Sequence, residues 1–286
     1  MKATSPPLGL IAGAGGLPRV AARALAREGR SVVAVGFEGL AEHALEAEVA
    51  GFRWIRLGQL ESLAVALREL SVSRVLLVGK VPKTLLFAHP GAGEGAGIVE
   101  LDDEARRLLA ALDLRGDDAL MAAVAEWLDA RGFELCDQAA VLDALKMPLG
   151  SITRAIPDAR AKADLAAGLP SLRALGRVGV GQCVVVKDGA VVAVEAVEGT
   201  DETIRRAGRL VGGGTTVIKA ARPHQDRRID LPVVGPDTRS ALAEAGAGTL
   251  ALEAGAVLLL EREVLVATAD ELGIAIWGFE PAEDET

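Results

Sequence analysis

Apolar and polar positions come in alternating blocks along the first half of this chain, and the blocks predict strands and helices in turn. Residues 8–12 are apolar, a glycine turn follows, helical spacing continues to about residue 30, and residues 31–36 are apolar again. The same alternation predicts strands at residues 53–57 and 74–78, and helices at residues 58–70, 101–112 and 117 to about 131. Strands that alternate with amphipathic helices are typical of a parallel sheet.

The pattern changes near residue 132. Asp188-Gly189 separates two apolar runs, residues 182–187 and 190–196, which is a strong signal for a β-hairpin. Further strands are predicted at residues 133–136, 249–252, 257–260 and 274–279, and helices from Thr200 as N-cap to about 210, at 236–245 and at 262–272. The stretch between residues 137 and 177 is expected to be irregular and mostly helical. We therefore predict an α/β protein with a Rossmann-like N-terminal domain holding a parallel sheet (residues 1–131) and a second α/β domain with a mixed sheet (residues 132–286).

Composition narrows the class of protein. Half of the 286 residues are hydrophobic, which allows a substantial core, and the net charge of -9 argues against a broad nucleic-acid surface. Cys136 and Cys183 lie in apolar segments and are expected to be unpaired thiols in a reducing compartment. The sequence shows neither a signal-peptide pattern nor an apolar run approaching the roughly 18 residues of a membrane span. A cytoplasmic protein is expected, with room for peripheral contact with a membrane.

Residues 217–234 hold the densest polar chemistry, placed between two apolar runs. Lys219 falls within the first run and Asp230 directly beside the second, so both charges must be paired or used. Between them lie Arg222, Gln225, Asp226 and Arg228. Cationic side chains interleaved with carboxylates suit a site that binds an anion and positions a metal ion or a water. The alternative is a solvated loop whose charges pair with one another.

The glycine turn after the first strand is a second candidate site. Gly13, Gly15 and Gly16 allow backbone N–H groups to approach an anion at the start of a helix. Pro18 occupies the position of the third glycine in the dinucleotide-binding fingerprint, so a nicotinamide or flavin cofactor and a plain tight turn both stay open as interpretations. Two lysines that follow another strand, Lys80 and Lys83, lie where open α/β sheets bind ligands.

Other polar residues mark the starts of helices. Either Asp117 or Asp118 can cap the helix that follows, which leaves the other free to contact a substrate. Glu195 and Glu198, which follow an apolar strand, are candidates for orienting a metal ion or a water, together with Asp201. Surface charges around a helix cap are the competing interpretation.

Five short motifs occur in order along nearly the whole chain: GLIAGAGGLP, GKVPK, RGDDAL, GQCVVV with EGTD, and KAARPHQDRRIDLP. Together they resemble the LpxI-type UDP-2,3-diacylglucosamine pyrophosphatases of lipid A biosynthesis. The resemblance implies a cytoplasmic, membrane-associating homodimer that uses Mg²⁺ or Mn²⁺. Such an enzyme hydrolyses the pyrophosphate of UDP-2,3-diacylglucosamine, held between two domains, to UMP and 2,3-diacylglucosamine 1-phosphate.

The same resemblance suggests roles for individual residues. The essential aspartate of the family's D-[LV]-P motif falls on Asp230, and the family's Q-D-x-R is present as Gln225, Asp226 and Arg228. The predicted catalytic residues are Asp230, Asp226, Lys219 and Arg228, and the predicted metal ligands are Asp230, Glu198 and Asp201. Substrate binding is predicted for Gly13, Gly15, Gly16, Lys80, Lys83, Asp117, Asp118, Gln182, Thr200, Arg222 and Gln225. The alternatives are an NAD(P)- or flavin-dependent protein built on the glycine turn, and a non-catalytic protein that binds a nucleotide sugar.

Overall fold

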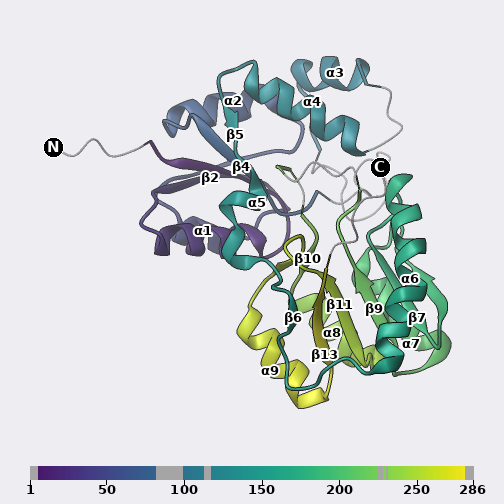
Figure 1. Cartoon of the computed structure of the whole chain (residues 1–286). Coiled ribbons are helices and arrows are strands. Elements are labelled where there is room, and N and C mark those ends of the chain that lie inside the picture. Colours follow the sequence, from purple (N-terminus) through teal and green to yellow (C-terminus); the bar gives the residue numbers. More distant parts are fainter. Residues whose placement is uncertain (1–5, 82–98, 113–116, 224–227, 230, 281–286) are drawn as a thin grey trace. The chain divides into compact units, whose positions relative to one another are not determined.

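The structure is a computed structural model that describes residues 6–81, 99–112, 117–223, 228–229 and 231–280, except for the side chains of residues 117–119. The chain divides into two compact units. The first unit is Met1–Val141 together with Asp226–Asp230, and the second is Leu142–Gln225 together with Leu231–Thr286. Each unit has its own sheet (Figure 1). Each unit also has its own hydrophobic core.

The first unit contains a five-stranded sheet in the order β3-β2-β1-β4-β5. Its strands are β1 (Leu8–Ala12), β2 (Val32–Phe37), β3 (Phe52–Ile55), β4 (Arg74–Val78) and β5 (Glu134–Leu135). Every neighbouring pair is parallel, which confirms the predicted parallel sheet. All five residues of the central strand β1 are buried, as a strand covered on both faces requires.

Helices of the first unit direct apolar residues toward this sheet. They are α1 (Leu17–Arg27), η1 (His43–Glu48), α2 (Leu60–Glu69), α3 (Asp103–Ala110), α4 (Asp117–Asp129) and α5 (Gln138–Val141). In α2, Leu63 and Leu67 are one helical turn apart, and both belong to the core cluster that includes Val33 and Val75 of the sheet. The carboxylate of Asp102 caps α3 by accepting a hydrogen bond from the Ala105 N–H at 2.8 Å.

The first unit extends further along the chain than the predicted boundary at residue 131. Glu134–Leu135 was expected to open the second domain, but it pairs with β4 as the edge strand of the first sheet. The division therefore follows Val141. The chain also returns to the first unit much later, because Ile229 is 6% exposed and belongs to the first unit's core cluster. Sequence periodicity does not reveal this return, since a single buried residue has no period.

The second unit contains a six-stranded mixed sheet in the order β6-β13-β11-β9-β7-β8 and a separate two-stranded pair, β10-β12. Its strands are β6 (Gly150–Ser151), β7 (Cys183–Lys187), β8 (Ala190–Val194), β9 (Thr216–Lys219), β10 (Val233–Val234), β11 (Thr249–Glu253), β12 (Leu258–Leu259) and β13 (Ala275–Phe279). The strands β9, β11 and β13 are parallel, whereas β6, β7 and β8 pair antiparallel with their neighbours. The predicted hairpin is confirmed, with Asp188 and Gly189 both at positive φ.

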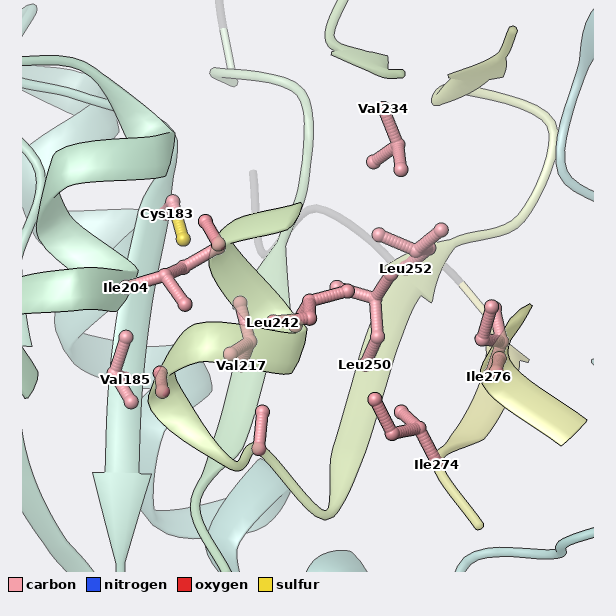
Figure 2. Packing of buried hydrophobic residues seen from close by; sticks show 14 of the residues in the cluster. Cys183, Val185, Ile204, Val217, Val234, Leu242, Leu250, Leu252, Ile274 and Ile276 are labelled. Carbon is pink, nitrogen blue, oxygen red and sulfur yellow. The ribbon is translucent and has the colours of Figure 1, made fainter. Parts of the chain in front are cut away.

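The two faces of this mixed sheet are covered by different helices (Figure 1). The helices of the second unit are η3 (Asp143–Leu145), α6 (Ala159–Arg177), α7 (Thr200–Val211), α8 (Pro236–Ala245) and α9 (Arg262–Leu272). Val217 and Leu250 pack with Ile204 of α7 and Leu242 of α8 (Figure 2). Ile218, the next residue along β9, packs on the opposite face with the α6 side. This alternation follows from the two-residue period of a strand.

One continuous helix, α6, occupies nearly half of the stretch between residues 137 and 177, which was expected to be irregular and mostly helical. It has 19 residues and contains Pro170. Gly168 allows it to approach the sheet, because a Cβ at this position would lie 2.5 Å from Val186 Cγ2 and 2.6 Å from Ile218 Cδ1. Glycine and proline disfavour a helix in this segment of the sequence. Packing of α6 against the sheet stabilises the helix in spite of them.

Two further predictions can be compared with the structure. Both cysteines are buried and free, as expected, and burial raises the pKa of the Cys136 and Cys183 thiols. In the described part of the chain, no helix is both long and apolar enough to cross a bilayer.

Candidate active site

The carboxyl ends of the central strands of the first unit carry the glycine turn predicted to bind an anion. Strand order reverses between β1 and β4, which is where open α/β sheets bind ligands. The chain leaves β1 through Gly13, Gly15 and Gly16, and it leaves β4 through Gly79 and Lys80. Four residues predicted to bind substrate, namely the three glycines after β1 and Lys80, are thus brought to one edge.

The two turns at this edge are held together by their backbones. The Ala14 N–H donates to the Lys80 carbonyl at 2.8 Å, and the Lys80 N–H donates to the Ala14 carbonyl at 2.9 Å. A Cβ on Gly13 would lie 2.5 Å from the Lys80 carbonyl oxygen, and one on Gly79 would lie 2.8 Å from the Ala14 carbonyl oxygen. Gly79 also has a φ of 89°. Sequence analysis missed Gly79 and did not anticipate this close contact at Gly13.

Among the described residues, no side-chain hydrogen bond caps the start of α1. Gly16 is the N-cap residue and makes no side-chain hydrogen bond, and Pro18 stands in the first turn. Gly15 has a φ of 86°, and a Cβ there would meet open space. Free N–H groups at a helix N-terminus attract anions, and the exposed Lys80 adds a positive charge at the same edge. This edge has the chemistry to hold a phosphate group.

In the second unit, Lys219 lies at the carboxyl end of β9 and is only 3% exposed. Strand alternation places it on the face of Val217, which is the face that α7 covers. The Lys219 Nζ donates hydrogen bonds to the Thr200 hydroxyl at 2.8 Å and to the Val233 carbonyl at 2.9 Å. A buried ammonium needs such partners, because water no longer solvates it.

A buried carboxylate completes the surroundings of Lys219. Glu195 follows β8 and is 8% exposed. Its Oε1 accepts from the Thr200 hydroxyl at 3.0 Å, and its Oε2 accepts from the Gln182 N–H at 3.1 Å. The structure therefore brings Gln182, Thr200 and Lys219, all predicted site residues, together with Glu195.

Thr200 is not the N-cap of α7, contrary to the sequence prediction. The helix begins at Thr200 itself, and Gly199 is the N-cap residue, with a φ of 82°. The Thr200 hydroxyl instead accepts a hydrogen bond from Lys219 and donates one to Glu195. Thr200, which was predicted to cap a helix locally, thus makes tertiary contacts.

The two predicted metal ligands in the described part of the second unit have protein partners. Glu198 accepts hydrogen bonds from Arg206 at 2.6 Å and from the Ala196 N–H at 3.2 Å. Burial raises the pKa of Glu198, but hydrogen bonds from the backbone and from Arg206 outweigh it and hold that pKa below its usual value. Asp201 accepts from the Thr238 hydroxyl at 2.6 Å. Among the described residues, no three His, Cys, Asp or Glu side chains gather as a metal site.

Sequence reasoning missed a second buried carboxylate, at the end of β11. Glu253 is 2% exposed, and its Oε2 accepts from the Ala221 N–H at 2.8 Å. Its Oε1 lies 3.4 Å from a guanidinium nitrogen of Arg173 on α6. The available signal was the charge that ends the apolar run TLALE, one position beyond Leu252, which pairs with Lys219. This carboxylate fixes the backbone just after Lys219.

The remaining predicted residues have less structural information. Lys83, Gln225, Asp226 and Asp230 lie outside the described residues, and Asp117 and Asp118 start α4 with side chains outside the description. Arg222 is partly buried and Arg228 is exposed, and neither is free of partners. Their predicted roles stay predictions.

Comparisons with known proteins cover both units. The chain matches the model of the LpxI N-terminal domain over residues 7–145 and that of the LpxI C-terminal domain over residues 148–277. A relative from Caulobacter vibrioides, named UDP-2,3-diacylglucosamine pyrophosphatase LpxI, is 31% identical in an alignment over 284 residues that covers 96% of this chain and 98% of the relative.

Similarity to solved structures is weaker. The Bordetella bronchiseptica enzyme WbmG, in complex with NAD and UDP, is 15% identical with a TM-score of 0.28, over 46% of this chain and 37% of that chain. The biotin carboxylase domain of the Hydrogenobacter thermophilus 2-oxoglutarate carboxylase is 11% identical with a TM-score of 0.26, over 71% of this chain and 40% of that chain. TM-scores this low do not establish a shared fold.

Proposed function

Because the chain belongs to the LpxI family, we propose that it is a UDP-2,3-diacylglucosamine pyrophosphatase. It would hydrolyse the pyrophosphate bond of this lipidated nucleotide sugar to UMP and 2,3-diacylglucosamine 1-phosphate. The observation that carries the proposal is the relative of that name, which aligns with 96% of this chain. The alignment also covers 98% of the length of this relative.

Fixed positive charge in both units supports this chemistry. A pyrophosphate is anionic near neutral pH, so its charge must be offset before an oxygen nucleophile can approach phosphorus. Lys80 and the uncapped start of α1 offer this in the first unit, and Lys219 offers it in the second. We propose that groups of both units contact the substrate. Arg222 and Arg228 would add further cations, since they lie in the same sequence motif as Lys219.

Asp230 is the proposed catalytic carboxylate, with Asp226 in support. This assignment rests on the family's D-[LV]-P motif, which Asp230-Leu231-Pro232 matches. Leu231 is buried, so the residue that follows Asp230 is anchored in the second unit. We propose that Asp230 activates the attacking water or binds the metal ion.

We also propose a requirement for a divalent cation, Mg²⁺ or Mn²⁺, which would polarise the phosphoryl oxygens. Among the described residues, the donor set does not form a complete metal site, since Glu198 is paired with Arg206 and Asp201 with Thr238. Mg²⁺ in phosphoryl-transfer sites is commonly held by one or two carboxylates together with substrate phosphates. Asp230 and Asp226 are therefore the preferred ligands in the proposal.

The decisive experiment is an assay for UMP with UDP-2,3-diacylglucosamine and with UDP-sugars that lack acyl chains. Wild-type protein should release UMP from the lipidated substrate in Mg²⁺ or Mn²⁺, and EDTA should abolish the release. Asp230→Asn should lower kcat by a factor on the order of 10² or more, as loss of a catalytic acid or base does. Asp237→Asn, an exposed aspartate seven residues along the chain, serves as the control and should leave turnover unchanged. Full activity of Asp230→Asn, or UMP release in EDTA, would reject the corresponding part of the proposal.

A further inference from the structure

Three buried side chains form a chain of hydrogen bonds from Lys219 through Thr200 to Glu195. The Lys219 Nζ lies 2.8 Å from the Thr200 hydroxyl, and that hydroxyl lies 3.0 Å from Glu195 Oε1. All three residues are less than 10% exposed. They come from β9, α7 and the end of β8, so three separate elements meet at this point.

The direction of each hydrogen bond in this chain is fixed by chemistry. An ammonium can only donate, and an ionised carboxylate can only accept. The single hydroxyl proton of Thr200 must therefore point to Glu195, and a hydroxyl lone pair must accept from Lys219. With the proton committed to Glu195, the side chain of Thr200 has one suitable orientation. Glu195 thus decides where the acceptor for Lys219 lies.

Both oxygens of Glu195 are already in use. Oε1 accepts from Thr200, and Oε2 accepts from the Gln182 N–H at 3.1 Å. A buried carboxylate held in this way is poorly suited to ligate a metal ion or to take a proton from water, which were the roles that the sequence suggested. Its negative charge instead balances the buried ammonium of Lys219 through the shared hydroxyl.

Among the described residues, two groups accept hydrogen bonds from the Lys219 ammonium. An ammonium carries three N–H groups, and the described partners of its Nζ are Thr200 and the Val233 carbonyl, the latter at 2.9 Å. Val233 opens β10, directly after the motif that begins at Lys219. Two bonds with fixed acceptors orient the third N–H, as a bound phosphate oxygen requires.

We propose that Glu195 is a positioning residue, which acts through Thr200 to hold the Lys219 ammonium in the direction of a substrate phosphate oxygen. This inference rests on the proposed function. Glu195 does not itself touch the substrate. A correctly oriented donor stabilises the transition state, in which charge builds on the phosphoryl group, more than it stabilises the bound substrate. The effect should therefore fall on kcat more than on KM.

The test uses Glu195→Gln, which removes the charge but keeps the shape, and a pair of threonine variants. Thr200→Val deletes the hydroxyl at nearly constant volume, whereas Thr200→Ser keeps it. Glu202→Gln, on the exposed side of the same helix and paired with Arg209, is the matched control. The kcat and KM for UMP release are measured at a temperature well below every variant's unfolding midpoint, so that only folded protein is compared.

We expect Glu195→Gln and Thr200→Val each to lower kcat by about 10- to 100-fold, which is the scale of a small misplacement of a contact group. Glu202→Gln should stay within about threefold of wild type, since it removes neither the relay nor a buried charge. Thr200→Ser, which keeps the hydroxyl, should recover most of the kcat that Thr200→Val loses. The double variant Glu195→Gln/Thr200→Val should be no slower than Thr200→Val alone, because Glu195 acts only through the hydroxyl.

The results distinguish a failure of the positioning role of Glu195 from a failure of the proposed function. Wild-type turnover with undiminished kcat in folded Glu195→Gln would overturn the positioning role and leave the proposed function standing. Additive losses in the double variant, or an equal loss in Glu202→Gln, would also overturn it. If Glu195→Gln does not fold, the contrast between Thr200→Ser and Thr200→Val decides, and equal activity of the two would reject the relay. Absence of UMP release from the wild-type protein would overturn the proposed function and this inference with it.

Discussion

In the first unit, the edge where β1 and β4 end is built from backbone, whereas in the second unit the edge where β9 and β11 end is built from buried charged side chains. At the first edge, Gly13 and Gly79 allow two turns to exchange hydrogen bonds between their main chains. At the second edge, Lys219 and Glu253 end neighbouring strands and are bonded to side chains and backbone around them. Both edges gather polar groups, but by different means.

This difference teaches which substitutions each edge tolerates. At the backbone edge, the close contact requires glycines without a Cβ. The destabilisation caused by an added Cβ is therefore steric and does not depend on pH or salt. At the charged edge, buried charges balance one another. A substitution there destabilises the protein when it removes one charge and leaves its partner buried. Four measurements can test this contrast, beginning with the largest expected effect.

Removal of the buried ammonium should cost the most. In Lys219→Met, Glu195 keeps its hydrogen bonds from Thr200 and Gln182 but loses the cation that balances its charge. We expect a loss of about 3–5 kcal/mol in the free energy of unfolding, as for other broken buried charge pairs. Chemical denaturation of the whole chain, followed by circular dichroism, measures it.

The double variant Lys219→Met/Glu195→Gln is the control for this prediction. It removes both charges, so it should recover a large part of the stability that Lys219→Met loses. A double variant as unstable as the sum of the two single variants would show that the two charges do not compensate each other.

A methyl group at the backbone edge should cost somewhat less. In Gly13→Ala, the new Cβ would lie 2.5 Å from the Lys80 carbonyl oxygen, and backbone cannot move aside as easily as a flexible side chain. We expect a loss of about 2–3 kcal/mol in unfolding free energy, the upper part of the usual range for single substitutions. Because the cause is steric, the loss should be the same in low and high salt. A loss that shrinks with salt would contradict this interpretation.

The neighbouring glycine separates steric clash from backbone strain. In Gly15→Ala, the Cβ would meet open space, but the φ of 86° stays unfavourable for alanine. We expect a loss of about 1–2 kcal/mol, from the backbone alone. Thermal unfolding of both alanine variants gives the comparison. A larger loss of stability in Gly15→Ala than in Gly13→Ala would show that the close contact between Gly13 and the Lys80 carbonyl is unimportant.

The smallest effect concerns ion pairs in each unit. Glu48 accepts hydrogen bonds from Arg19 and Arg23 in the first unit, and Glu198 accepts from Arg206 in the second. Burial raises the pKa of each carboxyl, but the hydrogen bonds outweigh it and hold both pKa values below the usual 4.5. A lowered folded-state pKa stabilises the protein above about pH 4.5, and this contribution is lost as the pH falls through the folded-state value.

Glu48→Gln and Glu198→Gln should therefore each cost up to about 1 kcal/mol at pH 7 and nothing in acid below the folded-state pKa. Unfolding midpoints measured from pH 7 to pH 3 give the difference from wild type. A deficit that persists unchanged in acid would mean that the carboxylates contribute through packing instead of charge.

Period and turn chemistry were sufficient to predict the architecture. Continuous apolar runs such as Leu8–Ala12 indicate strands covered on both faces, and the Asp188-Gly189 pair indicates a hairpin, because these signals arise from neighbours in the sequence. The family and the position of the glycine turn were also visible in local motifs. The boundary at residue 131 was less predictable, because a two-residue strand has no period and is assigned by its partner, β4.

The sequence by itself determined which elements form and which residue types are available for chemistry. Only the tertiary structure decided which of them meet. Thr200 illustrates the difference, since local rules predict a helix cap, whereas the fold places its hydroxyl between Lys219 and Glu195, respectively 19 and 5 residues away. Hydrogen bonds between distant residues depend on how strands and helices pack, and no local pattern encodes that packing.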